Sequence, residues 1–393
     1  MKARKFFSLL SAVAVVSALA TGCSDTKRPG GEHDFNVPSG VVPDESDTES
    51  SSVPSQSTDN SVQSGVQSTS EENSVSVPQI TANDPEKPYT PPDNDQQGEV
   101  SGSIMVLEDG RGIMLYGIGY EPGRNYAATV NKYKEQLGEY VNVFSMIVPT
   151  PVTFYMPEKY YEQGISDREL PHIEDVNDHL SGIIPIDAYA ALVDHTDEEI
   201  FYRTDHHWTQ LGAYYAAQAF AKMALVPFDD ISEYDRYEKD GYLGTLYGSS
   251  DNNPLIGNNP ETFFWYVPKR EVVTTYYDTD AQNGYEGNYF YKPDDFGSTV
   301  EWNLTYMAGD SRIVHVETGL DTNRRLMIIK DSYADSLTPC LFGSFDEIWV
   351  VDMRFCTTSA VQLAKDKDIT DLLFCSNTFS ATAQNQYKLE EIM

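Results

Sequence analysis

The chain has 393 residues, of which 61 are acidic and 27 basic, so its formal net charge is −34 at pH 7. A surface of this charge repels phosphate groups, which argues against nucleic acid and anionic lipid headgroups as ligands. A neutral or cationic polymer suits it better.

Residues 1–23 are predicted to be a bacterial lipoprotein signal peptide. Basic residues at its start are followed by an apolar run, 6–20, that is short for a membrane span. The run ends in small residues before Cys23, the predicted lipidation site and first residue of the mature protein. An ordinary secretory peptide with an incidental cysteine is the alternative. We therefore expect a protein lipid-anchored to the cell membrane on its extracytoplasmic face.

Residues 24–100 are predicted to be a disordered acidic tether. Ser, Asp, Glu, Pro, Thr and Gln dominate it, so it buries too little apolar surface to offset the entropy lost on ordering. It carries 15 acids and 3 bases, whereas residues 101–393 carry 46 and 21. The remaining chain, 101–393, is predicted to be one catalytic domain that is itself anionic.

The first half of that domain predicts alternating strands and helices. It opens with strands 103–107 and 113–116, joined through Asp109-Gly110, which is a hairpin signal. Thr209 can serve as N-cap for a helix through Leu225. Further helices are predicted at 125–137, 171–180 and 188–193, and further strands at 141–148, 183–186 and 200–202. This alternation favours an α/β fold, with a mostly parallel sheet and helices on its faces.

Residues 226–305 interrupt the alternation and are dense in Tyr, Asn, Asp and Gly. They predict a β-rich insertion or a cap over the site. Their aromatic clusters suit sugar rings, but they suit ordinary β packing equally well. The alternation then resumes with strands 325–330 and 347–351, helices 334–342 and 361–367, and a last strand, 370–375, that closes the sheet.

Three cysteines follow Cys23, namely Cys340, Cys356 and Cys375. An odd number allows at most one disulfide and leaves one thiol. Their apolar neighbours favour buried structural thiols, and none has the spacing of a metal site.

The run Asp205-His206-His207-Trp208 is the first candidate for chemistry. A carboxylate two residues before an imidazole can orient His207 and stabilise its charge as a general base. His206 would then point elsewhere, and Trp208 could pack beneath the imidazole. Two alternatives are a purely structural tetrad and a zinc site completed by His195 or His172. Adjacent histidines rarely both reach one ion and no HExxH frame exists, so no metal or other cofactor is expected.

Ser332 is the leading candidate nucleophile. It lies where the predicted strand 325–330 turns into a helix, and open α/β folds bind ligands at this end of their strands. Free N–H groups at a helix N-terminus can also stabilise an oxyanion. The alternative is that Asp331 or Ser332 merely caps the helix. Ser311, in Gly-Asp-Ser-Arg, is a rival, but a predicted strand follows it instead of a helix.

The run 204–208 followed by a helix, with 329–333 far downstream, resembles the DHHW family of bacterial surface proteins. That family is similar to the SGNH-hydrolase-like proteins of alginate O-acetylation. The resemblance implies an SGNH-like three-layer sandwich in which the histidine motif precedes the serine, a circular permutation of the usual order. It also implies Asp205, His207 and Ser332 as a catalytic triad. This chain has Lys330-Asp331 before the serine where the alginate relatives look Gly-Thr-like, so the rest of the oxyanion hole stays unassigned.

The expected function is a surface-anchored serine O-acetyltransferase or acetylesterase acting on a surface polysaccharide or exopolysaccharide. The resemblance implies a membrane-bound O-acyltransferase as the acetyl donor. Two rivals remain: a non-catalytic glycan-binding or assembly lipoprotein with a structural tetrad, and a metal-dependent hydrolase.

Overall fold

The structure is a computed structural model that describes residues 95–278, 281–309 and 313–393. The predicted signal peptide, Cys23, the tether up to residue 94, and Ser311 lie outside the described residues. Among the helices within these ranges, none is long and apolar enough to cross a bilayer.

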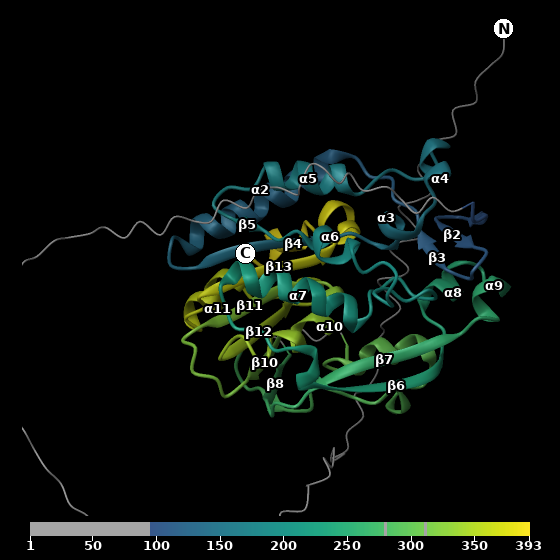
Figure 1. Ribbon diagram of the computed structural model, residues 1–393. Coiled ribbons are helices and arrows are strands. Elements are labelled where there is room, and N and C mark those ends of the chain that lie inside the picture. The colour runs from purple at the N-terminus through teal and green to yellow at the C-terminus, as the bar shows by residue number, and fades with distance from the viewer. Residues whose placement is uncertain (1–94, 279–280, 310–312) are drawn as a thin grey trace, which may run out of the picture. The chain divides into compact units, whose positions relative to one another are not determined.

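A large mixed sheet forms the centre of the domain (Figure 1). Its first five strands run parallel to one another, and the last three alternate in direction. In spatial order the strands are β5 (Ile184–Pro185), β4 (Asn142–Val148), β13 (Asp371–Asn377), β11 (Arg325–Lys330), β12 (Glu347–Asp352), β10 (Ile313–Glu317), β8 (Val273–Tyr277) and β9 (Tyr285–Glu286). This is a mixed α/β fold with a mostly parallel sheet, as predicted.

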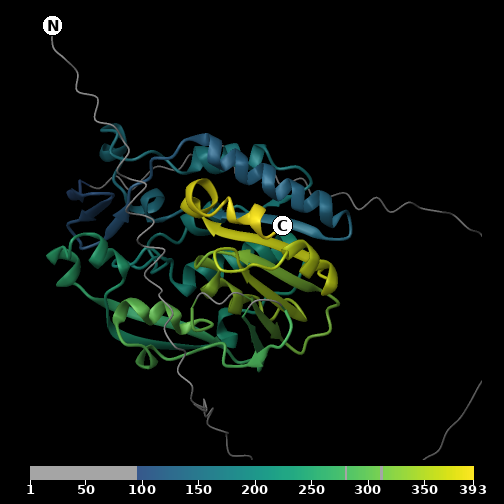
Figure 2. The ribbon, with the colours of Figure 1, turned by 180° about the vertical axis from the view of Figure 1, so that it is seen from behind.

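Helices cover both faces of the sheet, because side chains of each buried strand point alternately to opposite sides. Along β11, Leu326 and Ile328 pack into one core, and Met327 and Ile329 into the other. The first core takes residues from α6 (Ala188–Val193), α7 (Gln210–Ala224) and α10 (Tyr333–Leu337). The second takes residues from α2 (Tyr120–Leu137), α5 (Leu170–Asp178), α11 (Ala360–Asp366) and α12 (Lys388–Glu391). Figure 2 shows α2, in blue, beside the C-terminal segment, in yellow.

Most predicted elements are confirmed near their predicted bounds. Helix α6 begins and ends as expected, and α7 starts after Thr209, whose hydroxyl accepts a hydrogen bond from the amide of Gly212. Helix α2 begins five residues earlier than predicted, since Pro122 lies in its first turn, where no amide donor is needed. Residues 200–202 form no strand beyond an isolated bridge between Phe201 and Trp208.

The last strand, β13, does not close the sheet at an edge. It lies in the interior, hydrogen-bonded to β4 on one side and β11 on the other. Phe374, for example, pairs with both Ser145 and Ile329. All seven of its residues are buried, which fits the apolar run Leu372-Leu373-Phe374-Cys375 at its centre.

The predicted insertion divides into two parts. Its first part forms an arm, defined here as residues 234–268, in which β6 (Tyr234–Tyr242) and β7 (Glu261–Pro268) make a separate antiparallel pair. Between them lie the short helices α8 (Thr245–Ser249) and α9 (Pro254–Gly257). Its second part supplies β8 and β9 to the main sheet, followed by 3₁₀ turns η2 (Pro293–Asp295) and η3 (Thr299–Thr305).

A small antiparallel sheet begins the described chain, with strands β1 (Gly98–Ser101), β2 (Ile104–Leu107) and β3 (Gly112–Met114). The predicted hairpin is confirmed, and Gly110 has a φ of 80°, which glycine adopts without strain. The sheet shares a third core with residues of α3 (Pro151–Tyr155) and α4 (Glu158–Glu162).

Candidate active site

Asp205, His207 and Ser332 form a continuous hydrogen-bonded array. Ser332 Oγ lies 2.8 Å from His207 Nε2, and His207 Nδ1 lies 2.6 Å from Asp205 Oδ1. The histidine belongs to the loop before α7, and the serine to the turn between β11 and α10. Two segments 125 positions apart in sequence thus meet at the carboxyl end of a parallel strand.

Asp205 is fully buried, and both of its carboxylate oxygens accept hydrogen bonds. Its Oδ1 accepts from the backbone amide of His207 at 2.9 Å and faces the His207 ring. Its Oδ2 accepts from the amide and hydroxyl of Thr245, at 2.7 and 2.9 Å. Burial by itself would raise the pKa of Asp205. The positive charges that His207 and His206 can carry, together with these hydrogen bonds, hold the pKa well below its usual value.

The charge on Asp205 fixes the tautomer of His207. An ionised carboxylate can only accept hydrogen bonds, so Nδ1 of His207 must donate. In the neutral imidazole, Nε2 then carries the lone pair and accepts from the hydroxyl of Ser332. A general base acting on that hydroxyl needs this tautomer.

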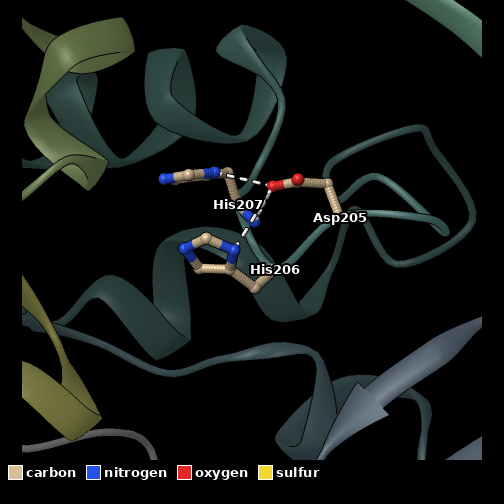
Figure 3. A group of neighbouring side chains, drawn as sticks. All are labelled: Asp205, His206 and His207. Atoms are coloured by element: carbon tan, nitrogen blue, oxygen red, sulfur yellow. Dashed lines mark hydrogen bonds and ion pairs between the residues drawn. The ribbon is translucent and has the colours of Figure 1, made fainter. Parts of the chain in front are cut away.

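His206 does not point away from the aspartate, contrary to the sequence prediction. Its Nδ1 lies 3.5 Å from Asp205 Oδ1 and 2.8 Å from Thr245 Oγ1. Figure 3 shows both imidazoles directed to the same side of the carboxylate. The ring centroids of His206 and His207 are 3.8 Å apart. The loop doubles back through the bridge between Phe201 and Trp208, so alternation along an extended strand does not apply.

The hydroxyl of Ser332 does not cap α10. The capping role falls to Asp331, whose Oδ1 accepts from the amide of Tyr333 at 2.9 Å. Asp331 Oδ2 also accepts from the amide and side-chain nitrogen of Asn377. Just before it, the fully buried Lys330 pairs with Asp352 and Asp335. These contacts fix the turn that carries the serine.

The amide of Tyr333 is therefore engaged by Asp331. The expectation that free N–H groups at the start of α10 stabilise an oxyanion stays a prediction. An aspartate at position 331 supplies a charged acceptor to the first helical amide, as N-cap side chains do.

Two hydrogen bonds connect the loop of the tetrad to α10. Trp208 Nε1 donates to the carbonyl of Tyr333 at 2.8 Å, and the hydroxyl of Tyr333 donates to the carbonyl of His206 at 2.5 Å. The Trp208 ring packs against Tyr333, with centroids 5.3 Å apart, where the sequence suggested the imidazole.

Three further residues at the site carry no recognisable sequence signal. Thr245 begins α8, Tyr242 ends β6, and Asn303 belongs to η3. Asn303 Nδ2 donates to the hydroxyl of Tyr242 at 2.7 Å and lies 3.2 Å from His207 Nδ1. Burial, and then the charge of Asp205, raise the pKa of Tyr242 well above its usual value. All three come from the predicted insertion, whose docking no local pattern reveals.

Of the residues predicted for the alternative zinc site, only three that are adjacent in sequence lie close enough together to share an ion. Within the described ranges, Asp205, His206 and His207 offer ligand atoms within 4.8 Å of one another. His195 instead lies 2.6 Å from Glu198 and stacks on Tyr215. His172 stacks on Tyr120. The Nδ1 atoms of His206 and His207 face Thr245 and Asp205, so the hydrogen-bonded arrangement accounts for them.

Cys340, Cys356 and Cys375 are buried and present as thiols, as their apolar neighbours suggested. Ser311 lies outside the described residues.

The fold and the site together define a mixed α/β protein with an aspartate–histidine–serine array at the carboxyl end of its parallel strands. The chain belongs to the DHHW family, since the family described as "DHHW protein" matches residues 42–351. A search of curated proteins found no match.

The chain is similar to several solved structures, one of which is itself a DHHW family protein. A DHHW family protein from Eubacterium siraeum DSM 15702 is 39% identical, with a TM-score of 0.69 over 75% of this chain and 96% of that one. PatB1 of Bacillus cereus, solved with a sulfonyl adduct, shares the fold at 17% identity and a TM-score of 0.56, over 75% of this chain and 98% of that one. The O-acetyltransferase domain of Pseudomonas putida AlgJ also matches, at 12% identity and a TM-score of 0.36, over 74% of this chain and 94% of that one. With so low an identity and TM-score, the similarity to AlgJ carries no conclusion about function.

Proposed function

We propose that the chain is a serine acyltransferase or esterase acting on O-acetyl groups of a cell-surface or exported polysaccharide. The observation that carries the proposal is the 2.8 Å contact between Ser332 Oγ and His207 Nε2, with Asp205 behind the same imidazole. A hydroxyl, a base and an orienting carboxylate in this order form the machinery of nucleophilic acyl transfer.

In the first half-reaction, Ser332 Oγ attacks the acetyl carbonyl while His207 Nε2 takes the hydroxyl proton. Asp205 stabilises the resulting imidazolium through Nδ1. The tetrahedral intermediate then expels the alcohol of the ester, which receives the proton from His207. An acetyl group is left on Ser332.

In the second half-reaction, an acceptor hydroxyl attacks the acetyl-serine and gives its proton to His207. Collapse of the intermediate breaks the bond to Ser332 Oγ, which regains the proton. A sugar hydroxyl as acceptor makes the chain a transferase, and water makes it an esterase.

The order of the motifs belongs to the same proposal. We take the domain as an SGNH-hydrolase-like three-layer sandwich in which the histidine motif comes before the serine, with the arm as part of an insertion. The helices on both faces of the sheet and the position of Ser332 after β11 support this reading.

The proposal includes a location and a partner. Lipid attachment at Cys23 and the acidic segment 24–100 would hold the domain outside the membrane, near the polysaccharide. A membrane-bound O-acyltransferase would supply the acetyl group. Replacement of Cys23 by serine should move the chain from the membrane fraction to the soluble fraction of cells.

Hydrolysis of p-nitrophenyl acetate by the full chain tests the catalytic role. We expect Ser332→Ala and His207→Ala to lower kcat/KM at least about 10³-fold, because each removes a member of one catalytic unit. Ser311→Ala is the matched control and should leave turnover unchanged. Melting temperatures close to that of the unaltered chain would show that the variants remain folded.

The rivals give other results in the same assay. A glycan-binding protein with a structural tetrad would show no turnover that depends on Ser332. A metal-dependent hydrolase would lose turnover with a chelator and regain it with zinc. A sulfonyl fluoride is a suitable second probe, since PatB1 was solved with a sulfonyl adduct. It should label Ser332 and leave Ser311 unmodified.

A further inference from the structure

The arm is docked onto the loop of the tetrad by a partly buried carboxylate. Glu261, on β7, accepts from the amides of Arg203 and Thr204 at 2.8 and 2.7 Å, and from the Thr204 hydroxyl at 2.6 Å. The Thr204 hydroxyl in turn accepts from the amide of Gly244 at 3.0 Å. A side chain at position 244 would collide with Asp205, because an added Cβ would lie 2.3 Å from the Asp205 Cβ. The arm thus brings the next residue, Thr245, directly against the aspartate.

Thr245 holds the oxygen of Asp205 that does not face His207. Its backbone amide donates to Oδ2 at 2.7 Å, and its hydroxyl donates to the same oxygen at 2.9 Å. Oδ1 is left for His207, whose ring and amide both lie within 2.9 Å of it. The hydrogen bonds from Thr245 and those from His207 therefore go to different oxygens of one carboxylate, and His206 Nδ1 lies 3.5 Å from Oδ1.

The proton of the Thr245 hydroxyl also determines what His206 does. A hydroxyl has one proton to donate, and here it goes to Asp205 Oδ2. The same oxygen must therefore accept from His206 Nδ1, which lies 2.8 Å away. One hydroxyl thereby links the carboxylate of the array to the second imidazole of the tetrad.

We propose that Thr245 is a positioning residue of the acyl-transfer site, whose hydroxyl orients Asp205 toward His207 and sets how strongly that carboxylate acts on the imidazole. The inference rests on the proposed function. It adds that the arm, far from the tetrad in sequence, supplies part of the catalytic geometry. Thr245 acts through Asp205.

The backbone amide of Thr245 already anchors Asp205, so the hydroxyl can be removed without leaving Oδ2 bare. Its loss would relax the carboxylate and leave His206 Nδ1 without this acceptor. It would also concentrate negative charge on Oδ1, because fewer donors then share the charge of the carboxylate. Greater charge beside His207 favours its protonated form.

The activity of a histidine base rises with pH as the imidazole loses its proton. Removal of the Thr245 hydroxyl should therefore shift this acid limb to higher pH. Other described titratable groups around Asp205 are His206 in the same loop, Tyr202, Tyr242 of β6 and Tyr333 of α10. Burial raises the pKa of each tyrosine well above its usual value, so none titrates in the range of the limb.

The experiment compares the full chain with Thr245→Val, Thr245→Ala and Thr245→Ser across pH, with p-nitrophenyl acetate as substrate. We expect kcat/KM to fall about tenfold to a hundredfold in Thr245→Val and Thr245→Ala, as for a misaligned catalytic group. The acid limb should move up by about half a pH unit or more, and Thr245→Ser should restore both. Thr299→Val is the matched control, because it removes a hydroxyl bond to Leu243 in the same arm without touching Asp205.

An unchanged acid limb in a folded Thr245→Val or Thr245→Ala chain would overturn the proposal, as would an equal loss of activity in Thr299→Val. So would a failure of Thr245→Ser to recover activity, or collapse of both hydroxyl-free variants. The proposed function fails separately, if Ser332→Ala is as active as the unaltered chain in the same assay.

Discussion

At the scale of single residues, the site depends on the carboxylate of Asp205, which is charged although it is fully buried. Asp205 accepts hydrogen bonds from the amide and hydroxyl of Thr245 and from the amide and ring of His207. This fixes His207 as the Nδ1–H tautomer and leaves Nε2 to accept from Ser332. A buried anion with fewer partners would take up a proton instead.

Asp205→Asn tests that dependence. An amide that donates through one atom and accepts through the other can stabilise the wrong tautomer and cannot balance the imidazolium. We expect kcat/KM on p-nitrophenyl acetate to fall by about 10³- to 10⁴-fold with little change in KM. Activity within tenfold of the unaltered chain would mean that Asp205 does not serve His207.

Glu169 gives a prediction about stability. Burial raises its pKa from 4.5 to about 6, although hydrogen bonds from Thr153 and Thr150 oppose this shift. The folded chain therefore holds a proton that the unfolded chain releases between pH 4.5 and 6. The stability contributed by this group is complete below pH 4.5 and is lost as pH rises through 6. The free energy of unfolding should fall by about 2 kcal/mol across that window.

Glu169→Gln should remove that slope in urea titrations at several pH values. Glu174→Gln, which changes an exposed carboxylate in α5, the helix that begins directly after Glu169, should keep it. Identical pH dependence in the unaltered chain and Glu169→Gln would show that the Glu169 carboxyl does not titrate in this way.

At the scale of elements, the site is made by the junction of a loop and a strand–helix turn. The hydrogen bonds from Trp208 to Tyr333 and from Tyr333 to His206 join the two segments beside the contact between His207 and Ser332. Lys330 fixes the turn that carries Ser332, because it forms ion pairs with Asp352 of β12 and Asp335 of α10.

Tyr333→Phe tests the junction. It deletes the hydroxyl that reaches His206 and keeps the buried ring, so it should cost about 1 kcal/mol in the free energy of unfolding. We expect turnover to fall several-fold even in the folded variant, because the loop that carries His207 loses a hydrogen bond to the helix that follows Ser332. Tyr289→Phe removes another buried bond to α10, at Asp335, and should cost similar stability with unchanged turnover. Equal activity in the two variants would contradict this role of the junction.

Local patterns predicted the elements well, because each strand and helix is determined by its own periodicity and caps. Thr209 before α7 and the apolar run of β11 are examples. The sequence of a strand does not specify which strands it pairs with, so the interior position of β13 could not be predicted. The pairing of Asp205 with His207 follows from a spacing of two residues. The approach of Thr245 depends on how the arm docks, and no residue near 245 signals it.

At the scale of the domain, two apolar cores lie on opposite faces of one sheet, and the polar array lies at the ends of its strands. The cysteines belong to these cores. Burial raises the pKa of the Cys340 thiol to about 12, and that of Cys375 well above its usual range. Neither thiol has thiolate available for exchange near neutral pH.

The reactivity of the thiols follows from this burial. In a chain carrying Cys23→Ser, an aromatic disulfide reagent should modify none of the three thiols while the protein is folded. It should modify all three in denaturant without prior reduction. Fewer than three thiols in the denatured, unreduced chain would indicate a disulfide and contradict the structure.

The central claim is tested most directly by finding where an acetyl group rests during turnover. The full chain is incubated with p-nitrophenyl acetate, quenched in acid, digested and examined by mass spectrometry. We predict an acetyl group on the peptide that carries Ser332, absent from Ser332→Ala and retained in Ser311→Ala. An acetyl group on Ser311, or turnover that persists in Ser332→Ala, would contradict the account.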